Sequence, residues 1–159
     1  MASIHNISIV GINGKEIRLD QFKGKKLLIV NVASACGFTF QYEQLEALYR
    51  QYRDRLTILG CPCNDFGSQE TGSEEEIMTF CTTTFDVTFP LTKKINIRTT
   101  PVHPLYQWLT HKERNGISDN EVSWNFQKYA ISPAGEWEHV FGAESSPLDE
   151  LILDWIDAA

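Results

Sequence analysis

The strongest constraint on the fold is a run of three elements: an apolar strand, an amphipathic helix and a second apolar strand. Residues 26–32 read K-L-L-I-V-N-V, which is typical of a short buried strand. Residues 41–53 repeat Tyr and Leu at helical spacing, and residues 56–61 form the next apolar run. Strands joined by one helix of this length are parallel, with a right-handed crossover. The sequence therefore predicts an α/β fold.

Further elements surround this unit. Residues 7–10 and 15–19 flank a turn and predict an N-terminal β-hairpin. Residues 125–132 and 137–141 predict a second hairpin, and residues 104–110 a short helix.

Capping residues predict where the helices start. Thr39 is the expected N-cap of the first helix. Ser73 and Glu76 form a capping box that begins a helix running through Cys81. The last helix is expected to have Pro147 as its first residue and Asp149 as its third. Its apolar face is expected to comprise Leu148, Leu151, Ile152 and Trp155.

Composition limits the class of protein. A chain of 159 residues fits one domain, so we expect residues 1–159 to fold as a single domain. A net charge of −7 argues against nucleic-acid binding and against a polybasic membrane anchor. The longest apolar stretch, residues 27–35, is too short and too interrupted to span a membrane. Residues 1–6 lack the pattern of a secretory signal, which favours a cytoplasmic protein.

The cysteines indicate chemistry rather than a disulfide scaffold. Four cysteines in 159 residues, all in the first half, are too few and too unevenly spaced to staple a fold. Cys36 lies between a buried strand and a helix, where the N-terminus of the helix favours the thiolate form. Small neighbours, Ala35 and Gly37, leave its sulfur uncovered. Its position alone fits a packed core residue equally well.

Two later segments contain hydrogen-bond donors. Residues 63–70 follow the second strand of the unit and therefore lie at the same sheet edge as Cys36. Gln69 offers an amide there, although a solvated loop would have a similar composition. Trp124 and Asn125 precede a late strand and offer indole and amide N–H groups. If these groups converge on Cys36 they stabilise a thiolate, and otherwise Trp124 is a core residue and Asn125 a turn residue.

Three motifs resemble those of one family, the glutathione peroxidases. Residues 30–39, V-N-V-A-S-A-C-G-F-T, resemble its nucleophile motif, with Cys where some members have selenocysteine. Residues 62–70 resemble its second motif, and residues 124–126 its third. Residues 103–106, H-P-L-Y, are also similar to a family segment. The similarity covers nearly the whole chain, with the motifs in the family order.

The resemblance implies a fold and a site. The family has a thioredoxin-like fold, here an N-terminal β-hairpin and a central mixed sheet flanked by helices. Cys36 would be the peroxidatic nucleophile, and Gln69, Trp124 and Asn125 would complete a catalytic tetrad. The substrates would be hydrogen peroxide and organic or lipid hydroperoxides. The mechanism requires neither a cofactor nor a metal.

Cys81 decides the reductant. Members that resemble this chain and use thioredoxin have a resolving cysteine after the position of Phe80. Cys81 would condense with the Cys36 sulfenic acid, and thioredoxin would reduce the resulting disulfide. A disulfide needs Cα atoms within roughly 7 Å, so we predict that the helix carrying Cys81 unwinds or moves. The alternatives are Cys63 as the resolving thiol, or glutathione as reductant with Cys81 structural.

Some residues depart from the family pattern, and others exclude rival classes of protein. Asp65 stands where Gln is usual and is expected to point away from the thiolate. The segment between His111 and Val122 lacks the long insertion of tetrameric members, so we expect a monomer or weak dimer. A thioredoxin-like metallochaperone would need a second cysteine at Phe40, and a disulfide oxidoreductase one at Thr39. A non-enzymatic binding module would have lost the donor residues. Cys61 is expected in the core.

Overall fold

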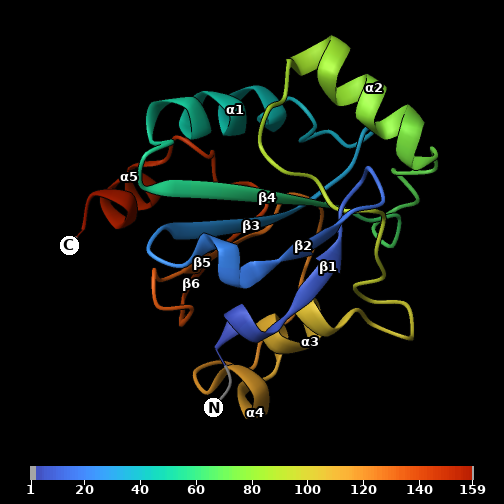
Figure 1. Cartoon of the computed structure of the whole chain (residues 1–159). Coiled ribbons are helices and arrows are strands. Elements are labelled where there is room, and N and C mark those ends of the chain that lie inside the picture. Colours follow the sequence, from blue (N-terminus) through green and yellow to red (C-terminus); the bar gives the residue numbers. More distant parts are fainter. Residues whose placement is uncertain (1–2, 159) are drawn as a thin grey trace.

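A four-stranded mixed sheet forms the centre of the computed structural model, which describes residues 3–158 (Figure 1). The ends of the expected domain, Met1, Ala2 and Ala159, lie outside the described residues. The strands are β1 (Ser8–Val10), β2 (Glu16–Arg18), β3 (Lys26–Val32), β4 (Leu56–Pro62), β5 (Lys128–Ile131) and β6 (Trp137–Phe141). The α-helices are α1 (Gln41–Gln51), α2 (Glu74–Phe85), α3 (Pro104–Thr110), α4 (Lys112–Asn115) and α5 (Glu150–Asp157). Short 3-10 helices span Ile4–Asn6 and Leu19–Phe22.

The sheet confirms the predicted central unit. Its strand order is β4-β3-β5-β6, and β1 and β2 form a separate antiparallel hairpin. Strand β3 pairs in parallel with β4, from Lys26 opposite Leu56 to Val32 opposite Pro62. Strands β5 and β6 continue the sheet antiparallel, so the sheet is mixed as expected. The parallel pair places the segments that follow β3 and β4 at one edge of the sheet.

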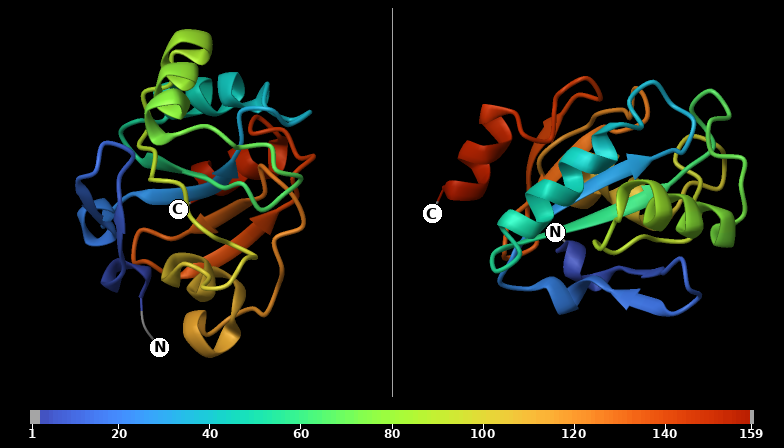
Figure 2. Two further views of the ribbon diagram at one scale, coloured as in Figure 1. Left: turned by 90° about the vertical axis from the view of Figure 1, so that its right-hand side faces the viewer. Right: turned by 90° about the horizontal axis from the view of Figure 1, so that it is seen from above.

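Each face of the sheet has its own apolar core. Helices α1, α2 and α5 cover one face, and the β1–β2 hairpin and α3 cover the other (Figures 1 and 2). Side chains of β3 alternate between the faces because successive residues of a strand point in opposite directions. The helix-side core includes Leu28, Val30, Leu45, Ile77 and Ile152. The hairpin-side core includes Leu27, Ile29, Ile9, Leu105 and Tyr129.

One predicted N-cap and one predicted helix start are wrong. Helix α1 begins at Gln41, and Phe40 precedes it without a side-chain cap, so Thr39 is not its N-cap. Helix α5 begins at Glu150, because the Asp149 side chain accepts the Leu151 N–H and makes Asp149 the N-cap. Pro147 therefore lies before the helix rather than at its first position. The capping box of Ser73 and Glu76 at α2 is confirmed.

The apolar face of α5 also differs from the prediction. Ile152, Trp155 and Ile156 are buried, whereas Leu151 is 67% exposed and Leu148 is 40% exposed. Leu148 precedes the helix, and Leu151 lies to one side of the face formed by Ile152, Trp155 and Ile156. Among residues 3–158, no helix is long and apolar enough to cross a membrane.

Candidate active site

Cys36 lies in a tight turn between β3 and α1. Thr39 Oγ1 accepts the Cys36 N–H at 2.9 Å and donates to the Ala33 carbonyl at 2.8 Å. The Phe38 N–H donates to Cys36 Sγ at 3.3 Å. The thiol is buried, with 8% of the residue exposed. Thr39 thus fixes the turn rather than capping the helix, and the backbone supplies one donor to the sulfur.

The loop of residues 63–70 is bonded to this turn. The Ala35 N–H donates to the Gln69 carbonyl at 3.1 Å, and the Ser34 N–H donates to Glu70 Oε1 at 3.2 Å. Gly67 and Ser68 have positive φ angles of 72° and 51°, which reverse the chain immediately before Gln69. The structure therefore places the second motif beside the first, as the parallel strands predict.

Asn31 positions the third motif from within β3. Its Nδ2 donates to the Trp124 carbonyl at 3.0 Å, and its Oδ1 accepts the Gln127 N–H at 3.1 Å. Its own carbonyl accepts the Phe126 N–H at 2.6 Å. Phe126 has a φ of 68°, an uncommon conformation for a bulky residue that these bonds hold in place. We did not assign this role from the sequence, although one amide inside an apolar strand demands partners.

Gln69 and Asn125 meet directly. Asn125 Nδ2 donates to Gln69 Oε1 at 3.0 Å and to the Phe66 carbonyl at 3.2 Å. This bond occupies the oxygen of Gln69 and leaves its Nε2 as a donor. Within the described part of the chain, neither side chain hydrogen-bonds to Cys36 Sγ. Asn125 therefore orients Gln69.

Trp124 packs at the edge of the same cluster. Its indole contacts both cores and meets the Phe66 ring edge-on, with centroids 6.1 Å apart. A Cβ added at Gly67 would lie 2.8 Å from Trp124 Cη2, so only glycine lets the loop approach this closely. Trp124, Gln69 and Asn125 thus form one packed group, joined to Cys36 through the Ala35 backbone.

The four cysteines divide between the two cores. Cys36 and Cys81 belong to the helix-side core, and Cys61 and Cys63 to the hairpin-side core. All four are buried free thiols. Burial raises the pKa of Cys81 to about 11 and those of Cys61 and Cys63 to about 12. The expectation that Cys61 is a core residue is confirmed.

The Asp65 carboxylate is bonded to residues 97–99 and acts on the Cys63 thiol rather than on Cys36, in line with the expectation. Its carboxylate accepts the backbone N–H groups of Ile97, Arg98 and Thr99 and the Thr99 hydroxyl. Burial opposes ionisation, but these hydrogen bonds outweigh it and lower the pKa of Asp65 to about 2. The carboxylate organises the loop of residues 97–99.

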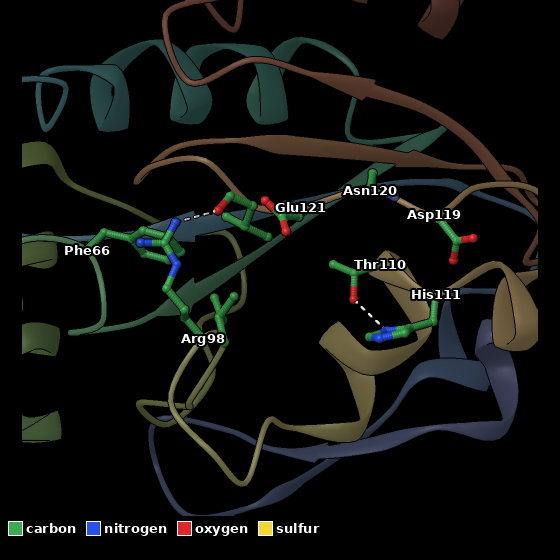
Figure 3. A pocket seen from close by; sticks show the side chains of 9 residues that line it. Phe66, Arg98, Thr110, His111, Asp119, Asn120 and Glu121 are labelled. Carbon is green, nitrogen blue, oxygen red and sulfur yellow. Dashed lines mark hydrogen bonds between the residues drawn. The ribbon is translucent and has the colours of Figure 1, made fainter.

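Two cavities lie near this group. One of about 750 Å³ is walled by Phe66, Arg98, Asp119 and Glu121 among others (Figure 3). The Arg98 guanidinium lies 4.5 Å from the Phe66 ring centroid and donates to the Val122 carbonyl. The cavity wall carries both positive and negative side chains, which indicate no single class of ligand. A smaller cavity of about 140 Å³ borders Gln69 and the Cys36 turn.

The fold defines a class, the proteins with a thioredoxin-like fold. A thioredoxin-family thiol:disulfide interchange protein from Chlorobium tepidum has the same fold, with a TM-score of 0.64 and 16% identity over 94% of this chain and 92% of that one. A crystal structure described as Trgpx in apo form matches with a TM-score of 0.74 and 36% identity, over 98% of this chain and 94% of that one. The expected thioredoxin-like fold is confirmed.

The chain belongs to the glutathione peroxidase family, whose model matches residues 4–110. A glutathione peroxidase-like peroxiredoxin of Saccharomyces cerevisiae, HYR1, is 41% identical over 92% of this chain and 91% of its own length. A hydroperoxy fatty acid reductase of Synechocystis is 41% identical over 96% of this chain and 93% of its own length. The family resemblance inferred from the motifs is confirmed, and the protein is a peroxidase.

Proposed function

We propose that this protein reduces hydroperoxides with Cys36 and is recycled through a Cys36–Cys81 disulfide by thioredoxin. The Cys36 thiolate attacks the O–O bond, releases an alcohol or water and becomes a sulfenic acid. The Cys81 thiol then condenses with it, which expels water and forms the disulfide. A thioredoxin dithiol reduces that disulfide by thiol–disulfide exchange and is itself oxidised.

The packed group around the turn supports the roles of the other residues. The Phe38 N–H already donates to the sulfur that carries the negative charge. Gln69 Nε2 and the Trp124 indole N–H are the side-chain donors that would bind the thiolate or the peroxide. Asn125 would hold Gln69 in that orientation through their 3.0 Å bond. Hydrogen peroxide and alkyl or lipid hydroperoxides share the O–O group that this arrangement addresses.

One observation carries the choice of Cys81. It packs in the same core as Cys36, whereas Cys63 packs in the core on the opposite face of the sheet. Cys63 could reach Cys36 only if the sheet edge rearranged, whereas α2 lies at the surface of the fold (Figure 1). Because Cys81 sits within α2, that helix must unwind or shift to form the disulfide.

The burial of Cys81 favours a second candidate, a glutathione-dependent peroxidase in which Cys81 is structural. Only 1% of Cys81 is exposed, and its raised pKa keeps it a thiol at neutral pH. Glutathione would then reduce the Cys36 sulfenic acid directly.

We further propose a reducing, cytoplasmic location and a monomer or weak dimer. The four free thiols fit a compartment in which disulfides do not persist.

The proposal is tested by measuring peroxide-dependent oxidation of NADPH in two parallel assays. One is coupled through thioredoxin and thioredoxin reductase, and the other through glutathione and glutathione reductase. Turnover with thioredoxin alone is the expected result. Turnover with glutathione alone would overturn the role of Cys81, and turnover with neither would favour a binding module.

A further inference from the structure

Glu70 is a buried carboxylate that the proposed cycle does not use. Only 1% of it is exposed. Its Oε1 accepts the Ser34 N–H at 3.2 Å, and its Oε2 is buried without a hydrogen-bond partner among residues 3–158. Its backbone is fixed, because its N–H donates to Asn64 Oδ1 at 2.9 Å and its carbonyl accepts from Lys94 Nζ at 3.3 Å. An unpaired buried carboxylate oxygen is costly and therefore indicates a use.

Glu70 lies between the segments that carry the two cysteines of the helix-side core. The cavity of about 140 Å³ is walled by Glu70, by Ala35, which precedes Cys36, and by Phe80, which precedes Cys81. Glu70 is bonded to the Cys36 turn through Ser34, and its charge acts on the Cys81 thiol. Glu70 therefore lies beside both the Cys36 turn and the part of α2 that carries Cys81.

The Cys81 thiol must lose a proton before it can react. Burial is the largest influence that raises its pKa to about 11; the Tyr42 hydroxyl acts in the opposite direction, and the charge of Glu70 in the same one. In its buried position on α2, Cys81 is therefore a thiol at neutral pH. The thiolate is the attacking species in disulfide chemistry. Resolution therefore needs a proton acceptor close to Cys81.

We propose that Glu70 accepts the Cys81 proton during resolution and returns it to the hydroxide that leaves Cys36. This inference rests on the proposed role of Cys81 as the resolving thiol. The Cys81 S–H bond breaks, the Cys81 sulfur attacks the Cys36 sulfur, and the S–O bond of the sulfenic acid breaks. The proton held by Glu70 joins the leaving hydroxide to give water. Glu70 ends as the carboxylate it began as, and no further oxidant or reductant is consumed.

The charged groups around Glu70 come from several elements. Lys94 favours its ionised form, and the bond from the Ser34 N–H acts in the same direction. Burial outweighs both and raises the pKa of Glu70. Glu76 of α2 shares the cavity wall, and Tyr42 of α1 lies near enough to feel the charge of Glu70. A carboxylate with a raised pKa transfers protons in both directions near neutral pH better than an ordinary one.

The test is single-turnover kinetics of reduced enzyme mixed with one equivalent of hydrogen peroxide. Acid quenching and mass spectrometry separate the loss of the Cys36 thiol from the formation of the disulfide. The variant is Glu70→Gln, which keeps an acceptor for the Ser34 N–H but cannot take a proton. The matched control is Glu75→Gln, an exposed residue of α2 with the same change of charge.

The expected result is a selective effect on one step. Glu70→Gln oxidises at Cys36 within about twofold of the wild-type rate, but resolves at least about tenfold more slowly at pH 7. Its resolution rate rises about tenfold per pH unit, because it follows the Cys81 thiolate. Glu75→Gln behaves as wild type in both steps. Equal resolution rates and equal pH profiles in Glu70→Gln and wild type would overturn the inference.

A measurement on the wild-type enzyme covers the case in which Glu70→Gln does not fold. Its resolution rate is expected to be flat above the raised pKa of Glu70 and to fall as Glu70 is protonated at lower pH. A rate that instead climbs about tenfold per unit from pH 6 to 9 would overturn the inference while leaving Cys81 as the resolving thiol. Absence of any Cys36–Cys81 disulfide in wild type would instead overturn the proposed function, and the inference with it.

Discussion

The two faces of the sheet contain the same number of cysteines but surround them differently. On the helix side, Cys36 lies in a turn with a backbone donor to its sulfur, and Cys81 lies near a carboxylate with a free oxygen. On the hairpin side, Cys61 and Cys63 are fully buried. Cys63 Sγ also accepts a backbone N–H, from Asp65 at 3.4 Å, yet burial raises both pKa values to about 12. Burial outweighs the hydrogen bonds at the hairpin-side thiols, and the carboxylate oxygen without a partner among residues 3–158, Glu70 Oε2, lies on the helix side.

The hairpin side instead supports the site. Asn31 belongs to the hairpin-facing series of β3, with Leu27 and Ile29, and it holds Trp124 and Gln127. One strand therefore serves both faces: alternate residues of β3 pack the proposed redox side, which contains Cys36 and Cys81, and hold the segment that carries Trp124 from the supporting side.

The largest expected effect separates Cys36 from the hairpin-side thiols. Cys36→Ser should reduce peroxide consumption to the level without enzyme, because a hydroxyl cannot replace the thiolate nucleophile. Cys61→Ser should keep its activity. The coupled NADPH assay measures both, and an active Cys36→Ser enzyme would remove the basis of the comparison.

The next effect compares Cys81 with Cys63. Cys81→Ser should complete one reduction event per enzyme and then stop with thioredoxin, because the sulfenic acid has no resolving partner. Cys63→Ser should turn over at close to the wild-type rate. Burst and steady-state phases of peroxide consumption distinguish them, and the reverse pattern would assign resolution to the hairpin side.

A smaller effect tests the supporting role of the hairpin side. Asn31→Ala leaves the Trp124 carbonyl and the Gln127 N–H without partners, which should lower the free energy of unfolding by about 2–5 kcal/mol. Peroxide reduction should slow as Trp124 loses its position. Urea denaturation and the rate of Cys36 oxidation measure the two effects; an unchanged stability would show that these bonds contribute nothing.

The smallest effect concerns the helix that must open. Ser73→Ala removes the capping bond to the Glu76 N–H and should cost about 1 kcal/mol of stability. If opening of α2 limits resolution, the variant resolves faster than wild type, by up to about fivefold. Slower resolution in single-turnover experiments would contradict the predicted opening of α2.

Much of the fold was predictable because it depends on local patterns. The bounds of β3 and α3 are those that apolar runs and Pro104 indicate, and the parallel β3–β4 pair follows from the helix between them. The start of α5 was not predictable, because both Pro and Asp are common at helix N-termini. Only the observed bond from the Leu151 N–H to Asp149 shows that Asp149 is the N-cap.

The residues of the candidate site could be named from the motifs, and their catalytic roles stay predictions; the contacts among them could not be named. The motifs identify Cys36, Gln69, Trp124 and Asn125. The Thr39 side chain holds Cys36 in a turn, which has no periodic sequence pattern. The Asn31 side chain holds Trp124, which lies 93 positions away in the sequence. Glu46 of α1 is a further example of a contact that sequence patterns do not predict. Its carboxylate is buried and accepts the N–H of Thr88, 42 positions away in the sequence.

Peptide mapping of the oxidised enzyme tests the central claim most directly. Reduced protein is treated with one equivalent of hydrogen peroxide, its remaining thiols are blocked, and the digest is analysed by mass spectrometry without reduction. The expected result is one disulfide, between Cys36 and Cys81, with Cys61 and Cys63 recovered as blocked thiols. A disulfide joining Cys36 to Cys63 would contradict the division of the molecule into a redox side and a supporting side.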